Sequence, residues 1–203
     1  MKVALVGATG NAGSRILNEL LERGHMVTAI VRRPDRVPIH PWIVAIGTDG
    51  SEDALAAAIK GNDAVVSSVR FVDLAPEVLV AAVKKSGVKR YVVVGGAGSL
   101  LHPDGIEEAL RPDFPEAFRA NSLRGGDLLT LLRQTPELEW TFISPPRIFR
   151  PGERTGKFRY GKDHMLMTDD GMPTSISFED FALGLANELE NPRHARERFT
   201  IGY

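Results

Sequence analysis

Residues 3–13 have the sequence VALVGATGNAG, in which a short apolar run leads into three glycines at intervals of three. The unbroken apolar run from Val3 to Val6 is typical of a strand that is buried on both faces of a parallel sheet. Gly7 then permits a tight turn, Gly10 lets the main chain approach a pyrophosphate, and Gly13 lets the next helix lie close to the strand. Because the N–H groups at the start of a helix attract anions, the pattern predicts a phosphate-binding turn.

Other residues of this turn support the same interpretation. Thr9 and Asn11 can add side-chain hydrogen bonds to a phosphate, and Ala12 precedes the last glycine. A glycine-rich turn can also do no more than connect a strand to a helix, and a single motif leaves that alternative open. The position directly between a buried strand and a helical pattern favours the cofactor site.

The rest of the chain repeats this alternation of strand and helix. Apolar residues at helical spacing predict a first helix over Asn11–Arg23, ended by Gly24. Further strands are predicted at Met26–Val31, Trp42–Ile46, Ala64–Val69, Tyr91–Val94 and Trp140–Ser144, and further helices at Glu52–Ile59, Pro76–Lys85 and Pro115–Arg133. Because parallel strands need helical crossovers, this order predicts an α/β fold with a doubly wound parallel sheet, the Rossmann fold, and helices on both faces.

The chain beyond residue 144 departs from the alternation. Lys157–Tyr160 and Met165–Thr168 flank the turn-forming residues 161–163, which predicts a small C-terminal hairpin insertion. Ser177 is the predicted N-cap of a helix over Phe178–Leu189, and Phe199–Tyr203 is the predicted final strand.

Composition limits the class of protein. The chain has 203 residues, of which 43% are apolar, and we expect a single domain over residues 1–203. The net charge of −1 gives no electrostatic reason for a nucleic acid or a membrane surface as partner. The short apolar run at residues 3–6 is unlike a signal peptide and no run of about 18 apolar residues occurs, so we expect neither a signal peptide nor a membrane span. Cysteine is absent, which excludes disulfides and thiolate metal sites. We expect a cytoplasmic protein that acts on a small molecule.

Two arginines, Arg32 and Arg33, end the second predicted strand. In this fold an acidic residue at that place binds the ribose 2′-hydroxyl of NAD, whereas an arginine accommodates the 2′-phosphate of NADP. No carboxylate precedes Asp35, and Arg36 can share the role, so the sequence favours NADP(H) over NAD(H). The alternative is that the arginines are solvated residues after an edge of the sheet.

Further motifs match a known family in their order and spacing. They are GNDAVVS at 61–67, YVVVGGAGS at 91–99, and SPPR at 144–147 with PG at 151–152. Together with the glycine turn and the arginine pair, they make the whole chain resemble the atypical short-chain dehydrogenase/reductases. The resemblance is to the branch that includes NmrA-like regulators and the biliverdin and flavin reductases.

This resemblance implies cofactor contacts in the loops that follow the strands. Thr48 and Asp49 would contact the adenine, and Ser67, Ser68 and Val69 would line the adenosine side. The residues implied around the nicotinamide are Gly95, Gly96, Ala97, Pro145, Pro146, Arg147 and Ile148.

The catalytic pair of the family is missing. Short-chain dehydrogenases that reduce carbonyls carry Tyr-x-x-x-Lys on the long helix, where this chain has Arg119 and Leu123. The candidate catalytic residues are Ser99 to orient an acceptor, Arg147 to hold an anionic group, and His102 as an acid. No cluster of histidines or carboxylates has metal-ligand spacing, so no metal is predicted.

Three functions are compatible with these features. An NADPH-dependent oxidoreductase with a flavin- or quinone-like acceptor does not need the missing tyrosine, because the acceptor stacks on the nicotinamide and solvent supplies the proton. A non-catalytic NADP-binding regulator of the NmrA type, with a protein partner, explains the missing pair equally well. A nucleotide-sugar epimerase or dehydratase would need a general acid that the sequence does not reveal. Either a monomer or a homodimer is expected.

Overall fold

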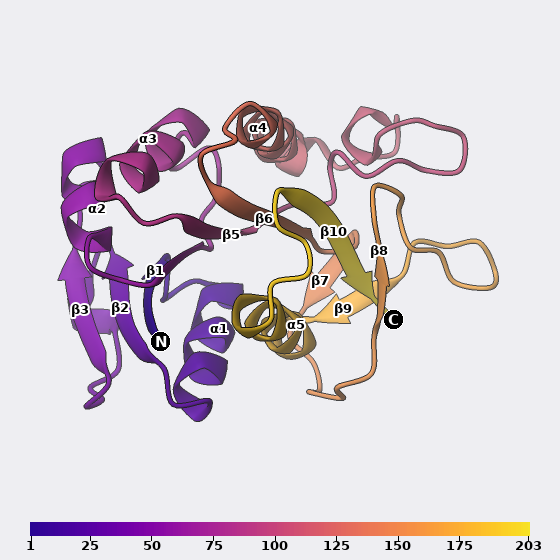
Figure 1. Ribbon diagram of the computed structural model, residues 1–203. Helices are drawn as coiled ribbons and strands as arrows, with labels where there is room; N and C mark the ends of the chain where they lie inside the picture. Colours follow the sequence, from indigo (N-terminus) through magenta and orange to yellow (C-terminus); the bar gives the residue numbers. More distant parts are fainter.

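The computed structural model describes residues 1–203, which are arranged around an eight-stranded sheet (Figure 1). Its strands are β1 (Lys2–Val6), β2 (Met26–Val31), β3 (Ile43–Gly47), β4 (Ala64–Ser67), β5 (Arg90–Val94), β6 (Glu139–Ser144), β8 (Arg159–Gly161) and β10 (Glu197–Gly202). They lie in the order β3-β2-β1-β4-β5-β6-β10-β8, and every pair is parallel except β10 with β8. Since β1 and β4 are central neighbours and the winding reverses between them, the predicted doubly wound fold is confirmed.

Helices cover both faces of the sheet. The helices α1 (Asn11–Glu22) and α5 (Phe178–Glu190) pack on one face, and α2 (Glu52–Ile59), α3 (Pro76–Ser86) and α4 (Glu116–Arg133) pack on the other (Figure 1). Along β1, Val3 and Leu5 join the core under α1 and α5, whereas Ala4 and Val6 join the core on the opposite face. Two covered faces are the reason that the run Val3–Val6 of β1 is apolar at successive positions. No helix of the protein combines the length and the apolar character that crossing a membrane requires.

Local signals set several helix ends. The hydroxyl of Ser177 accepts a hydrogen bond from the N–H of Asp180 at 2.9 Å, so Ser177 is the N-cap of α5, as predicted. Ser51 caps α2 in the same way, with 3.3 Å between its hydroxyl and the N–H of Ala54. Because such signals lie within one turn of the element, the predicted helices and parallel strands end close to their observed bounds.

The predicted hairpin does not form. Its first arm becomes β8, which pairs with the last strand β10, with Tyr160 opposite Ile201. Met165–Thr168 is irregular and makes one isolated bridge, from Met167 to Pro173. The prediction was wrong because pairing with β10 covers an otherwise free strand edge, which is a long-range gain that turn residues do not reveal. Separate from the main sheet, β7 (Ile148–Arg150) and β9 (Ser175–Ser177) form a short parallel pair.

Candidate cofactor site and active site

The glycine turn, residues 7–13, follows the carboxyl end of β1 at the centre of the sheet. Gly7 has a φ of +89°, and a Cβ there would lie 2.2 Å from the carbonyl oxygen of Ser68. A Cβ at Gly13 would lie 2.1 Å from the carbonyl oxygen of Gly7. Both positions therefore require glycine. At Gly7 the turn lies against the residue after β4, and at Gly13 the first turn of α1 lies against the glycine turn.

Gly10 differs because an added Cβ would make only ordinary van der Waals contacts there. A Cβ there would come no closer than 3.4 Å to another atom. Gly10 is the N-cap of α1 without a side-chain hydrogen bond, and the first backbone bond of the helix runs from Ser14 N to Gly10 O. The N–H groups of Asn11, Ala12 and Gly13 consequently have no partner in the protein. Gly10 and Asn11 are exposed, and unpaired N–H groups at an exposed helix N-terminus fit a pyrophosphate.

Side chains around the turn add to this surface. Thr9 and Asn11 are exposed, and neither side chain forms a hydrogen bond with the protein. Ser68 contributes its carbonyl, which faces Gly7, and Val69 packs its side chain against the same position. Ser67 is different: it is buried, and its hydroxyl lies 2.9 Å from the hydroxyl of Tyr91. Thr9, Asn11, Ser68 and Val69 therefore border the turn, whereas the side chain of Ser67 belongs to the core.

Three arginines, Arg32, Arg33 and Arg36, follow β2 at the same edge of the sheet. All three are exposed, and none forms an ion pair or a side-chain hydrogen bond with another residue. The N–H of Thr48 donates to the carbonyl of Val31 at 3.0 Å, which holds the loop after β3 beside Arg32. Positive charges without a carboxylate partner are complementary to a phosphate dianion.

The loop that the resemblance assigns to the adenine keeps its shape through its own side chains. The hydroxyl of Thr48 accepts from Gly50 N at 3.0 Å, and a carboxylate oxygen of Asp49 accepts from Ser51 N at 2.9 Å. Hydrogen bonds from the backbone and the side chain of Ser51 hold the pKa of Asp49 below its ordinary value. Both residues therefore form a fixed turn next to the arginines.

The loops implied around the nicotinamide lie side by side. Gly95, Gly96 and Ala97 follow β5, and residues 145–148 follow β6. Because β5 and β6 are parallel neighbours, with Val94 opposite Ile143, both loops leave the sheet at the edge where the glycine turn also lies.

Arg147 is held by residues from the loop after β5. Its Nη1 donates to Oδ2 of Asp113 at 2.9 Å, its Nη2 donates to the Asp113 carbonyl at 3.0 Å, and its Nε lies 3.2 Å from Oε1 of Glu108. Glu108 is fully buried, and its other carboxylate oxygen lies 2.5 Å from Nε2 of His102. The hydrogen bond from Arg147 holds the pKa of Asp113 below its ordinary value. Arg147 and His102 thus share one buried carboxylate.

Ser99 lies in a different group of side chains. Its hydroxyl accepts from Nη1 of Arg198 at 3.3 Å, and Nε of Arg198 donates to Asp163 at 2.8 Å. These residues line a cavity of about 540 Å³ beside α4. The three candidate catalytic residues therefore do not form one cluster, because His102 and Arg147 meet at Glu108 whereas Ser99 meets Arg198.

Sequence reasoning missed Glu108, Asp113 and Arg198. Glu108 is six positions from His102 but pairs with Arg147 from a loop beyond the next strand. No periodicity or motif in the sequence marks such a residue. The feature that identifies Glu108 is its complete burial, which can be seen only in the tertiary structure.

The long helix α4 contains neither tyrosine nor lysine. Arg119, at the position expected for the tyrosine, donates to the carbonyls of Ala109 and Phe114 and pairs with Glu116 at 2.7 Å. Leu123, at the position expected for the lysine, is exposed. Arg119 thus fastens the preceding loop to α4 instead of serving as a proton relay.

Comparison with known proteins assigns the family. Residues 7–192 match the NAD(P)H-binding family. The chain belongs to this NAD(P)H-binding family. It is 37% identical to YwnB of Bacillus subtilis (strain 168), a protein described as uncharacterized, over 99% of this chain and 98% of that protein.

Two solved structures resemble the whole chain. A protein of Bacteroides thetaiotaomicron, provisionally described as an epimerase, is 40% identical with a TM-score of 0.93, covering 100% of this chain and 96% of that one. A protein of Streptococcus pneumoniae TIGR4, provisionally described as an NADH-flavin reductase, is 33% identical with a TM-score of 0.84, covering 100% and 99%. The NAD(P)-binding Rossmann family that the sequence motifs suggested is confirmed, and NAD(P)H is the class of cofactor.

Proposed function

We propose that this member of the family is an NADPH-dependent reductase that transfers a hydride to a small conjugated acceptor of the flavin or quinone type. The observation that carries the proposal is the composition of α4, which has no tyrosine and no lysine to donate a proton to a carbonyl. The balanced reaction converts NADPH, one solvent proton and the oxidised acceptor into NADP⁺ and the reduced acceptor. When bound, the dihydronicotinamide supplies the hydride, so the protein has to bind and position both partners.

The residues on the adenosine side have direct roles in this proposal. The N–H groups of Asn11, Ala12 and Gly13 hold the pyrophosphate, assisted by the hydroxyl of Thr9. Arg32 and Arg33 hold the 2′-phosphate, and Arg36 adds positive charge beside them. Since no acidic side chain precedes Asp35 after β2, the end of this strand offers arginines instead of the carboxylate that binds the free 2′-hydroxyl of NADH, which favours NADPH.

The residues on the nicotinamide side position the reacting rings. The loops Gly95–Ala97 and 145–148 form the surface on which the nicotinamide lies, and the acceptor stacks on its other face. The side chain of His102 is 9% exposed and bonded to Glu108, so we assign the proton to solvent and assign His102 and Glu108 the positioning of Arg147. Ser99, whose hydroxyl is held by Arg198 at the cavity beside α4, is assigned the orientation of the acceptor.

The test follows the near-ultraviolet absorbance of NADPH with FMN, riboflavin and a short-chain quinone as acceptors. We expect turnover with at least one acceptor, and a kcat/KM at least about tenfold higher for NADPH than for NADH. Tight binding of NADPH without turnover of any acceptor would refute the reductase and leave the NADP-binding regulator as the better function. Equal kcat/KM values for the two cofactors would refute the role of the arginines.

A further inference from the structure

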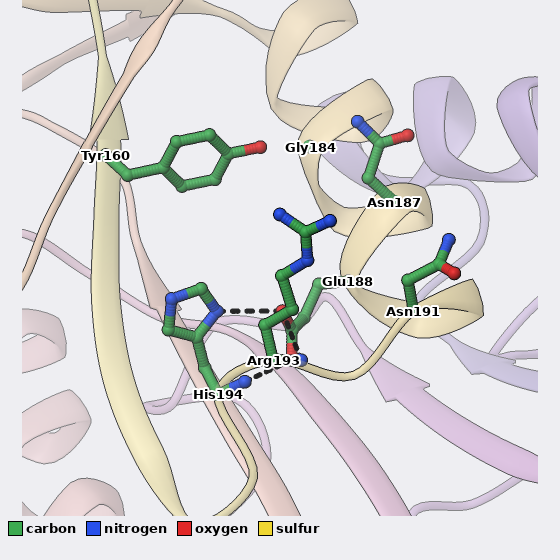
Figure 2. A pocket seen from close by; sticks show the side chains of 7 residues that line it. All are labelled: Tyr160, Gly184, Asn187, Glu188, Asn191, Arg193 and His194. Atoms are coloured by element: carbon green, nitrogen blue, oxygen red, sulfur yellow. Dashed lines mark hydrogen bonds and ion pairs between the residues drawn. The ribbon is translucent and has the colours of Figure 1, made fainter.

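A second cavity lies where α5 ends and β10 begins. It has a volume of about 370 Å³, within the range of small-molecule sites, and is lined by Tyr160, Gly184, Asn187, Glu188, Asn191, Arg193 and His194 (Figure 2). β1 and β10 run in the same direction, since all strand pairs that link them are parallel. The glycine turn follows the carboxyl end of β1, whereas this cavity adjoins the amino end of β10. The two sites are therefore at opposite edges of the sheet.

The floor of the cavity is organised by Glu188, which is buried. Its carboxylate accepts hydrogen bonds from Nη2 of Arg90 at 3.1 Å and from the N–H of His194 at 3.0 Å, and it lies 2.8 Å from Nδ1 of His194. The hydroxyl of Thr141 and the N–H of Arg193 add further bonds. The charge of the Glu188 carboxylate is thus balanced by the buried Arg90, and its oxygens are all hydrogen-bonded within the protein. Glu188 holds the backbone of Arg193 but does not pair with the Arg193 guanidinium.

Several groups that face the cavity have no partner in the protein. They are the guanidinium of Arg193, the carboxamide of Asn191 and the hydroxyl of Tyr160, and Figure 2 shows the guanidinium rising between Tyr160 and α5. Asn187 uses its oxygen to accept from Arg23 at 2.9 Å, which leaves its NH₂ group as a donor. Guanidinium, amide and hydroxyl donors around one space are complementary to an oxyanion.

The surrounding charges agree with an anionic ligand. Glu190, the acidic residue at the end of α5, pairs with Arg23 at 2.6 Å and contacts His25 at 2.9 Å, so it does not neutralise Arg193. The carboxyl end of α5 contributes a partial negative charge of roughly half an elementary charge, which the full positive charge of Arg193 exceeds.

Aromatic rings form one wall of the same space. The rings of Tyr160 and His194 are 17° from parallel, and their centroids are 6.4 Å apart. Both rings also pack against the buried ring of Phe199, with 5.9 Å between the centroids for Tyr160 and 4.2 Å for His194, so the three rings form a continuous wall. Tyr160 is 51% exposed, so a flat ligand ring can pack against this wall from the side of the cavity.

We propose that this cavity binds a small planar aromatic oxyanion, an aromatic carboxylate or an aromatic phosphate ester. Its oxyanion pairs with Arg193 and its ring lies against Tyr160 and His194. The site is separate from the NADP(H) site, and the proposal does not depend on the reductase activity.

The test is a titration of the full-length, isotope-labelled protein with benzoate or phenyl phosphate, followed by heteronuclear NMR. We expect saturable shifts of the Asn191, Arg193 and His194 amides with at least one ligand, and none at Gly10. Arg193→Gln should weaken binding about tenfold or more, because a charged hydrogen-bonded pair is lost. Lys162→Gln is the matched control, since Lys162 is exposed and outside the cavity, and it should bind like the wild type.

A second variant tests the aromatic wall. Tyr160→Leu should reduce benzoate affinity to the level of cyclohexanecarboxylate, which has the same charge but no flat ring. NADPH affinity, measured by calorimetry, should be the same in all variants, which separates this proposal from the cofactor site. The proposal is overturned if neither ligand gives saturable shifts, if Arg193→Gln binds normally, or if the shifts centre on the glycine turn.

Discussion

The two halves of the candidate active site are built in different ways. On the adenosine side, the N–H groups of residues 11–13 and the guanidiniums of Arg32 and Arg33 have no partner in the protein. On the nicotinamide side, Arg147 is paired with Asp113 and Glu108. Exposed donors give up only hydrogen bonds to water when they bind a ligand, whereas a paired side chain must also lose a bond within the protein. In the proposed function, the adenosine side therefore supplies free donors for the cofactor, and the nicotinamide side keeps its side chains in fixed positions.

The largest expected effect comes from the glycine turn, on which the binding half depends. Gly7→Ala places a Cβ 2.2 Å from the Ser68 carbonyl at a φ of +89°. We expect a loss of at least about 3 kcal/mol in the free energy of unfolding and loss of NADPH binding. Urea unfolding and calorimetry measure both.

Gly24→Ala is the matched control for the glycine turn. Gly24 also has a positive φ, +78°, but no atom lies within 4 Å of the position that an added methyl group would take. We expect a loss of about 1 kcal/mol, the cost of the backbone conformation alone. Equal losses in the two variants would show that the collision with Ser68 is unimportant.

The next effect concerns the unpaired charges. Arg32→Ala combined with Arg33→Ala removes two charged donors, and we expect the Kd for NADPH to rise about 100-fold and the Kd for NADH to change less than about threefold. Lys60→Ala, an exposed lysine at the end of α2, is the control. A similar loss for both cofactors would show that the arginines do not recognise the 2′-phosphate.

The smallest expected effect comes from weakening the ion pair between Arg147 and Asp113 on the nicotinamide side. Asp113→Asn weakens the contact with Arg147, and we expect the KM for FMN to fall about twofold to threefold while that for riboflavin, which has no phosphate, stays constant. A higher KM for FMN would instead mean that Asp113 holds Arg147 in its binding position.

The same pair has a predictable pH dependence. Because Arg147 lowers the pKa of Asp113, the pair contributes fully above the ordinary value of 3.8 and its contribution is lost as the pH falls through the lowered pKa. A shift of the Asp113 carboxyl resonance in NMR titrations, absent in Arg147→Gln, measures this directly.

The parts of the fold that were predicted correctly depend on short stretches of sequence. The strand at residues 3–6, the turn at Gly7 and the cap at Ser177 are each specified by neighbours within one turn of chain. The arginines after β2 follow from position alone, because any residue there lies beside the glycine turn in a doubly wound sheet.

The parts that were missed depend on residues far apart in the sequence. The hairpin prediction failed because β8 pairs with β10 rather than with its own neighbour. Glu108 was missed because its importance comes from complete burial between His102 and Arg147. Neither relation leaves a periodic pattern in the chain.

The sequence by itself determined the doubly wound sheet, the glycine turn and the arginines that follow β2 beside it, since these rest on local backbone preferences and on the order of strands and helices. Only the tertiary structure decided that Arg147 is paired with Asp113, and that Ser99 contacts Arg198 whereas His102 contacts Glu108. It also revealed the second cavity beside Arg193. The physical reason is that the state of a polar side chain is set by which distant groups folding brings within hydrogen-bonding distance.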